Sequence, residues 1–124
     1  MRRRIRLIAF ALAALFATTA CTPEQILLYL ESTEHVRDVL SNEDLHRLRM
    51  CESTDNYGAV SPSGTYRGAY QFDQTTWNDV AGRHFPWLLG QDPAAADPWW
   101  QDAMARALWS ERGKQPWPIC GNRV

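Results

Sequence analysis

The apolar positions of this chain recur mainly at helical spacing, and polar residues mark where the helices begin and end. Residues 97–113 give the clearest pattern, because Asp97 suits a helix N-cap, Pro98 the first helical position and Gly113 the position after the end. The apolar stripe between them consists of Trp100, Ala103, Met104, Ala107 and Leu108. We therefore expect a helix here whose stripe faces the core.

A weaker helical pattern covers residues 22–40. Thr22 and Gln25 have the spacing of a capping box, and Pro23 suits the first helical position. Apolar residues follow at roughly helical spacing, but a polar run at 31–34 interrupts them. We interpret residues 21–44 as a helical stalk or linker ahead of a domain over residues 45–124.

A second well-marked helix is predicted from about residue 42 to residue 53. Ser41 suits its N-cap, with Asp44 three residues later, and the stripe on one face consists of Leu45, Leu48 and Cys51. A shorter helix is expected over 73–80, and residues 66–72 could hold short strands. The fold class is therefore mostly α, with an α+β arrangement left open.

The first twenty residues have the pattern of a cleaved secretory signal. Four Arg precede an apolar run, Leu7–Ala17, which is too short to cross a hydrocarbon layer of about 30 Å. Small residues then lead to Cys21, a position typical of lipid attachment. Lipidation of Cys21, ordinary cleavage nearby and a retained anchor all stay open. Each predicts a protein that is secreted or anchored on the outer side of the membrane.

Length and charge exclude several classes of function. A chain of 124 residues has room for one compact domain. Without the four N-terminal Arg, it carries nine basic and fourteen acidic side chains, a net charge of −5, which disfavours nucleic acid as a partner. The sequence has no glycine-rich phosphate-binding motif and no Cys/His cluster with metal-ligand spacing. We therefore expect no cofactor and no metal.

Three cysteines suggest one disulfide bond. If Cys21 is lipidated or removed, Cys51 and Cys120 remain, and in an oxidising compartment a disulfide is the default. Such a bond would join the two ends of the domain and add roughly 4 kcal/mol by the chain-entropy model. The alternative is two unpaired, buried thiols.

Glu52 is the candidate catalytic acid. It follows Cys51 and lies near the C-terminus of the helix expected over 42–53, where the helix dipole disfavours a carboxylate and raises its pKa. A carboxyl group that stays protonated near neutral pH is what cleavage of a glycosidic bond requires. Considered alone, one glutamate among fourteen acidic residues is usually a solvated surface charge.

An ordered set of motifs resembles the resuscitation-promoting factors, which are secreted cell-wall lytic enzymes related to lysozymes and lytic transglycosylases. The matching motifs are Cys51-Glu-Ser53, Asn56-Tyr57, Tyr66-Arg-Gly-Ala-Tyr-Gln-Phe72, Thr75-Thr-Trp77 and Trp117-Pro-Ile-Cys120. They occur in the family's order and spacing over about residues 45–124. The resemblance implies a small lysozyme-like fold with an end-to-end disulfide. It also implies peptidoglycan glycan strands as the substrate, cleaved by transglycosylation or by hydrolysis.

The resemblance also assigns roles to residues. Glu52 takes the place of the catalytic acid, and Gln71 and Thr76 fall where family members line the sugar-binding cleft, with Tyr66 beside them. Trp77 is expected in the core, and Trp117 beside the disulfide.

Three positions near Glu52, namely Thr54, Asp55 and Tyr57, depart from the family pattern. Thr54 and Asp55 stand where the family has glycine, and Tyr57 where it has tryptophan. Asp55 and Tyr57 are candidate substrate contacts, although Asp55 could instead be a turn residue that bonds its own backbone. A non-catalytic peptidoglycan-binding or envelope interaction module is the alternative function, and a small structural lipoprotein is a third. No feature of the sequence identifies a protein partner.

Overall fold

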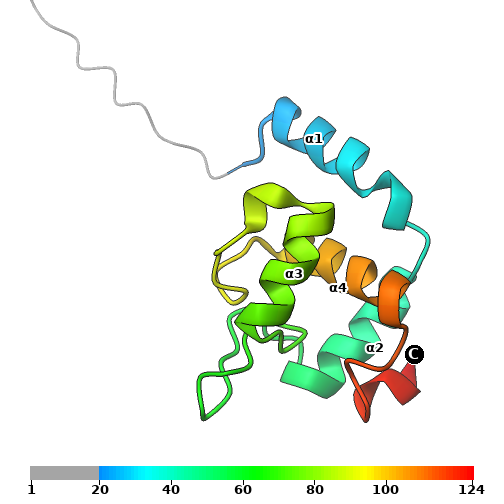
Figure 1. Ribbon diagram of the computed structural model, residues 1–124. Helices are drawn as coiled ribbons and strands as arrows, with labels where there is room; N and C mark the ends of the chain where they lie inside the picture. Colours follow the sequence, from blue (N-terminus) through cyan, green and yellow to red (C-terminus); the bar gives the residue numbers. More distant parts are fainter. Residues whose placement is uncertain (1–19) are drawn as a thin grey trace, which may run out of the picture.

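The computed structural model describes residues 20–124, and most of them are helical (Figure 1). The predicted signal segment, residues 1–20, lies outside the described residues apart from Ala20. The elements in chain order are α1 (Pro23–Thr33), η1 (Glu34–Val36), α2 (Asn42–Ser53), α3 (Gln74–His84), η2 (Pro86–Leu88), α4 (Pro98–Arg112) and η3 (Cys120–Arg123), where η marks a 3-10 helix. This confirms the mostly helical fold expected of a small lysozyme-like domain.

Helix α4 supplies much of the core. Its buried side chains are Gln101, Ala103, Met104, Ala105, Ala107 and Leu108. They include the predicted stripe except Trp100, which is only partly buried. The Asp97 side chain makes no cap hydrogen bond. The Asp97 carbonyl oxygen instead accepts the first helical bonds, from the backbone N–H groups of Trp100 and Gln101 at 2.9 and 3.1 Å. Pro98 and the backbone therefore define this helix start.

Helices α2 and α3 begin where the sequence predicts. Ser41 and Asp44 form the capping box of α2, and the Asp73 carboxylate accepts from the Thr76 N–H to cap α3. Helix α3 extends four residues beyond its predicted end. Its last turn is supported by Arg83, which bonds Asp79 within the helix and Glu111 of α4.

The segment predicted as a stalk contributes to the core. The capping box of α1 is present, and the Tyr29 ring packs edge-on against Trp100 with centroids 5.2 Å apart. Val36 and Leu40 are 1% and 4% exposed. The domain boundary at residue 45 stays a prediction, although buried residues lie ahead of it.

Residues 55–72 form a long loop between α2 and α3. Within the described chain, β pairing is limited to two isolated antiparallel bridges, Val60 with Arg67 and Arg67 with Phe72. The extended segments expected over 66–72 are therefore single bridges, not strands. No helix in residues 20–124 is both long enough and apolar enough to span a bilayer.

Candidate active site

Two adjoining cavities form a groove between α2, the long loop and the C-terminal segment, which is the part of the chain that follows α4. The first has a volume of about 510 Å³ and is lined by Cys51, Glu52, Tyr66, Gln71, Pro116, Trp117, Pro118, Ile119 and Cys120. The second, of about 190 Å³, shares Tyr66, Gln71, Pro116 and Trp117 with the first and adds Tyr70, Phe72, Asp73, Thr76, Leu108 and Arg112. The shared residues make the two cavities one continuous surface.

Glu52 lies on the last turn of α2 and lines the first cavity. The side chain is half-buried, and this loss of solvent raises the pKa of its carboxyl group above the ordinary value of 4.5. None of the hydrogen bonds or ion pairs found within residues 20–124 involves the Glu52 carboxyl group. With no cation to stabilise the charged form, the carboxyl group holds its proton to higher pH than a solvated glutamate would.

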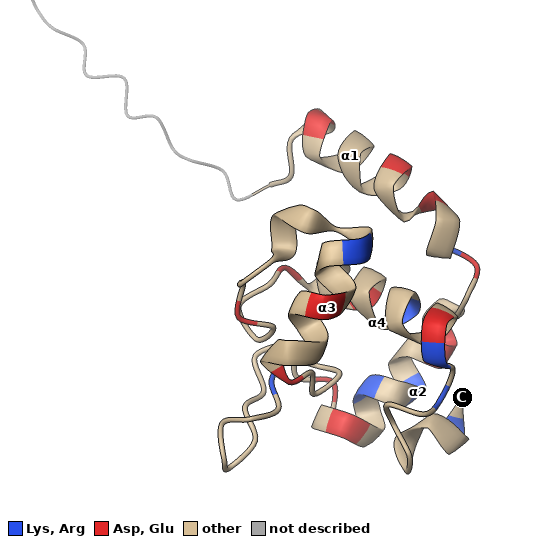
Figure 2. Ribbon diagram, in the orientation of Figure 1, with Lys and Arg blue, Asp and Glu red and all other residues tan. Residues whose placement is uncertain are grey.

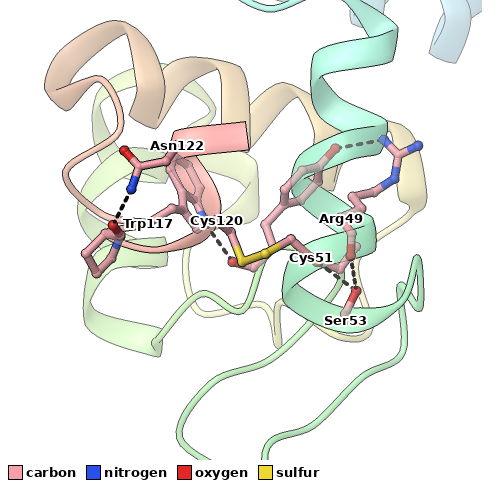
Figure 3. The surroundings of a disulfide bond; sticks show 9 residues. Arg49, Cys51, Ser53, Trp117, Cys120 and Asn122 are labelled. Carbon is pink, nitrogen blue, oxygen red and sulfur yellow. Dashed lines mark hydrogen bonds between the residues drawn. A yellow bond between two sulfur atoms is a disulfide. The ribbon is translucent and has the colours of Figure 1, made fainter. Parts of the chain in front are cut away.

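The predicted disulfide is present and forms one side of the groove. Cys51 and Cys120 are bonded across a sequence separation of 69 residues, which holds η3 against the end of α2 (Figure 3). Trp117 is 3% exposed, and its indole N–H donates to the Tyr70 carbonyl oxygen at 3.0 Å. The backbone beside Glu52 is therefore fixed to the C-terminal segment by a covalent bond.

The loop that carries Tyr66 and Gln71 is held by buried hydrogen bonds. The Ser53 hydroxyl group donates to the Ala69 carbonyl oxygen at 2.8 Å, and the Ala69 N–H donates to Oε1 of Gln101 at 2.9 Å. Gln71 adopts a left-handed backbone, with φ 54°, and its side-chain amide donates to the Gly68 carbonyl oxygen. A non-glycine residue in this conformation is strained and marks a constrained position.

Thr76 lies in the second cavity, on the first turn of α3. Its hydroxyl group donates to Asp73 Oδ2 at 2.9 Å, and its N–H donates to Oδ1 at 2.8 Å. The structure therefore brings Glu52, Tyr66 and Gln71 together on one cavity and places Thr76 on its continuation.

Asp55 and Tyr57 line neither cavity. The Asp55 carboxylate accepts from Nε of Arg49 at 2.7 Å, and the Tyr57 hydroxyl group donates to Oδ1 of Asp102 at 2.8 Å. Arg49 also donates to the Tyr70 hydroxyl oxygen and to Asp102. Both candidates thus belong to a polar network that joins α2 to α4 and the long loop.

This network was missed by sequence reasoning, as were several residues of the groove, among them Arg112 and Ile119. Asp102 reads as an ordinary polar position on a helix, and Arg112 as a cation in a last helical turn. Ile119 is 78% exposed and lines the first cavity. It lies within the Trp117–Cys120 motif, so that motif was the one available signal.

Metal chemistry has no ready ligand set in the described part of the chain. Residues 20–124 contain no group of three or more His, Cys, Asp or Glu side chains placed to hold a metal ion.

The sequence that forms the groove matches a known protein family. The transglycosylase-like domain family matches residues 39–120. Curated relatives include the probable transglycosylase SceD of Staphylococcus aureus (strain MRSA252), which is 37% identical over 76 residues that cover 61% of this chain and 32% of the relative. The SceD protein of Staphylococcus haemolyticus (strain JCSC1435) is 36% identical over 76 residues, covering 61% of this chain and 31% of the relative.

The chain spans about a third of the length of these curated relatives. No solved structure matches it. The family match nevertheless covers well over half of the chain, including Glu52, both disulfide cysteines and every groove residue. This chain belongs to the transglycosylase-like domain family.

Proposed function

We propose that this protein cleaves the glycan strands of peptidoglycan between N-acetylmuramic acid and N-acetylglucosamine, with Glu52 as the general acid. The observation that carries the proposal is the half-buried Glu52 carboxyl group on the groove wall, whose pKa is raised by desolvation. A protonated carboxyl group beside a groove is suited to donate a proton to a leaving glycosidic oxygen. The family and the printed names of the relatives support a transglycosylase reaction.

The reaction begins when Glu52 gives its proton to the glycosidic oxygen as the bond from that oxygen to the muramyl C1 breaks. The sugar left behind has oxocarbenium character at C1. The Glu52 carboxylate then takes a proton from a hydroxyl group that attacks C1. If that group is the muramyl 6-hydroxyl, a ring closes and the product is an anhydro sugar. If it is water, the product is a reducing end.

The carboxylates near the groove favour the intramolecular route. Glu52 is the single acidic residue that lines the first cavity. Asp55 is bound by Arg49, and both oxygens of Asp73 accept hydrogen bonds from Thr76. A retaining hydrolase needs a second carboxylate as nucleophile, and an inverting one needs it to activate water. An internal hydroxyl group needs neither, so we expect transglycosylation.

A closer relationship to the resuscitation-promoting factors is part of this proposal. It is supported by the ordered motifs from Cys51 to Cys120 and by the position of Glu52, Tyr66 and Gln71 on one cavity. The proposed substrate requires action outside the cytoplasm. Signal cleavage or lipid attachment at Cys21 would deliver the protein there.

The test is digestion of purified cell walls, followed by mass spectrometry of the soluble products. The proposal predicts released muropeptides whose muramyl ends are lighter than reducing ends by one water. Reducing ends alone would indicate hydrolysis. Co-sedimentation with walls, without release, would contradict the proposal and favour a non-catalytic glycan-binding module.

A further inference from the structure

The second cavity contains a cation that the proposed reaction does not use. Among the described residues that line the groove, Arg112 alone carries a permanent positive charge. Glu52 lines only the first cavity and Arg112 only the second, with Tyr66, Gln71 and Trp117 shared between them. The groove therefore has an acid in one part and a cation in the other.

The hydrogen-bond donors of Arg112 are largely free for a ligand. A guanidinium group has five N–H donors, and the contact found for this one is a 3.2 Å bond to Oδ2 of Asp79. That carboxylate already accepts two shorter bonds from Arg83, at 2.6 and 3.0 Å. The Arg112 side chain is 41% exposed. Acidic and basic residues lie side by side at this end of α4 (Figure 2). Of the two arginines that contact Asp79, Arg112 makes the longer bond and Arg83 the two shorter ones.

The acidic residue of the second cavity does not pair with Arg112. Asp73 directs one oxygen to the Thr76 N–H and the other to the Thr76 hydroxyl group, at the N-terminus of α3. The helix dipole favours negative charge at that place. The Asp73 carboxylate is therefore committed to the helix start, and Arg112 is left facing the cavity.

The chemistry of the proposed substrate supplies an anion for this position. The sugar rings of the glycan are uncharged in the parts that would pass Glu52. Each muramyl residue carries a lactyl group that ends either in a peptide with free carboxylates or in a carboxylate of its own. Arginine binds carboxylates through two parallel hydrogen bonds, which adds directional selectivity to the charge.

We propose that Arg112 binds a carboxylate carried by the muramyl residue and so makes this protein selective for strands with free acidic groups. The proposal rests on the function proposed above, and it adds a specificity-determining residue in a part of the groove separate from the acid. Because the pair is partly exposed, the expected preference is modest, about twofold to fivefold, and it weakens at high salt.

The experiment compares kcat/KM of the full chain on three soluble, uncross-linked strands. The first carries stem peptides with free carboxylates, the second carries the same peptides with their carboxyl groups amidated, and the third lacks peptides and exposes lactyl carboxylates. The variants are Arg112→Gln, Arg112→Lys and, as a matched control, Arg83→Gln. Arg83 contacts the same Asp79 but lines neither cavity.

The parent protein should cleave free-acid strands about twofold to fivefold faster than amidated ones. Arg112→Gln should lose this preference and cleave free-acid and amidated strands at equal rates. Arg112→Lys should keep part of it, and Arg83→Gln all of it. If the parent cleaves the peptide-free strand faster than the amidated strand, and Arg112→Gln does not, the ligand is the lactyl carboxylate. If the parent prefers only the strand whose peptides have free carboxylates, the ligand is a carboxylate of the peptide.

Equal rates of the parent on all three strands would overturn the inference, as would a preference that survives in Arg112→Gln. If the parent cleaves none of the strands, the proposed function fails instead. Co-sedimentation of the same variants with free-acid and amidated walls then shows whether Arg112 binds a carboxylate, because the parent should bind free-acid walls more tightly and Arg112→Gln should not.

Discussion

At the scale of single residues, the proposed reaction depends on the surroundings of one carboxyl group, that of Glu52. The backbone at Glu52 is held in place, since the neighbouring residue Cys51 forms a disulfide bond with Cys120. The nearest guanidinium group along the helix, that of Arg49, is occupied by Asp55 and Asp102. Partial burial without a compensating cation raises the pKa of Glu52.

This raised pKa predicts how stability depends on pH. A carboxyl group whose pKa is higher in the folded than in the unfolded state opposes folding when it ionises. That cost is absent below its ordinary value of 4.5 and is fully present once the pH exceeds the raised folded value. Glu52→Gln should therefore be as stable as the parent in acid and more stable than the parent at neutral pH.

The measurement is denaturant unfolding of both proteins from pH 3 to pH 8, with Glu34→Gln as an exposed control. This control measures the effect of removing a negative charge from the surface, away from the groove. A Glu52→Gln protein that becomes less stable than the parent as the pH rises would mean that the charged carboxylate is stabilised in the fold.

A groove residue can be predicted from the sequence when it stands within a short recognisable motif. Glu52 stands within a short motif beside a cysteine, and Gln71 within another, so both could be found by inspection. Arg112 reaches the groove only because α4 ends beside α3. Asp55 and Tyr57 follow Glu52 in sequence, but a left-handed turn at Thr54 and Asp55, with φ 55° and 62°, leads the chain away from the groove.

At the scale of elements, the groove depends on how the long loop is attached to α4. Gln101 is 2% exposed, and its side-chain amide donates to the carbonyl oxygens of Tyr57 and Ala96 while Oε1 accepts from the Ala69 N–H. Gly68 is adjacent, and a Cβ atom there would lie 2.6 Å from Oε1 of Gln101. The loop thus has no room for a side chain at this glycine.

A pair of glycine substitutions tests this attachment. Gly64 and Gly68 both have a positive φ, 77° and 82°, but a Cβ atom at Gly64 would meet no atom within 4 Å. Gly64→Ala should cost about 1 kcal/mol, from backbone strain alone. Gly68→Ala should cost about 1–3 kcal/mol more, because Gln101 must move.

Thermal unfolding of the two variants measures the difference. The Gly68→Ala protein should also lose lytic activity, since the same loop carries Tyr66 and Gln71. Equal destabilisation by the two substitutions would show that the loop is not packed against Gln101.

The start of α3 was more predictable than its end for a physical reason. The capping boxes at Thr22 and Ser41 and the cap at Asp73 are local hydrogen bonds that short polar motifs encode. The end of α3 depends on Arg83 meeting Glu111, which lies 28 residues further along the chain. Such a contact has no local signature.

At the scale of the whole molecule, the disulfide joins the two segments that enclose the first cavity. By the chain-entropy model, closing a loop of this length stabilises the fold by about 4 kcal/mol. Replacing both cysteines, Cys51→Ser with Cys120→Ser, should therefore lower the free energy of unfolding by about 2–5 kcal/mol.

Cys21→Ser is the matched control, because Cys21 lies outside the disulfide and should leave stability unchanged. Denaturant unfolding under oxidising conditions compares the two proteins. A double-serine protein as stable as the parent would mean that the packing of Trp117 holds the C-terminal segment without the bond.

The mostly helical fold, the disulfide and the buried stripe of α4 could be predicted because each has a strong pattern in the sequence. The packing of residues 29–40 on the core could not, since their periodicity is broken by the polar run at 31–34. Val36 and Leu40 are buried because the segment around η1 packs against α4.

The most direct test of the central claim is the rate at which Glu52→Gln releases soluble muropeptides from purified walls, compared with Asp55→Asn. Both substitutions remove a carboxylate near the end of α2, but only Glu52 lines the groove. Loss of general acid catalysis should slow Glu52→Gln by about 10²- to 10⁴-fold, while Asp55→Asn keeps most of the parent's rate. A Glu52→Gln protein with the parent's activity would contradict the account.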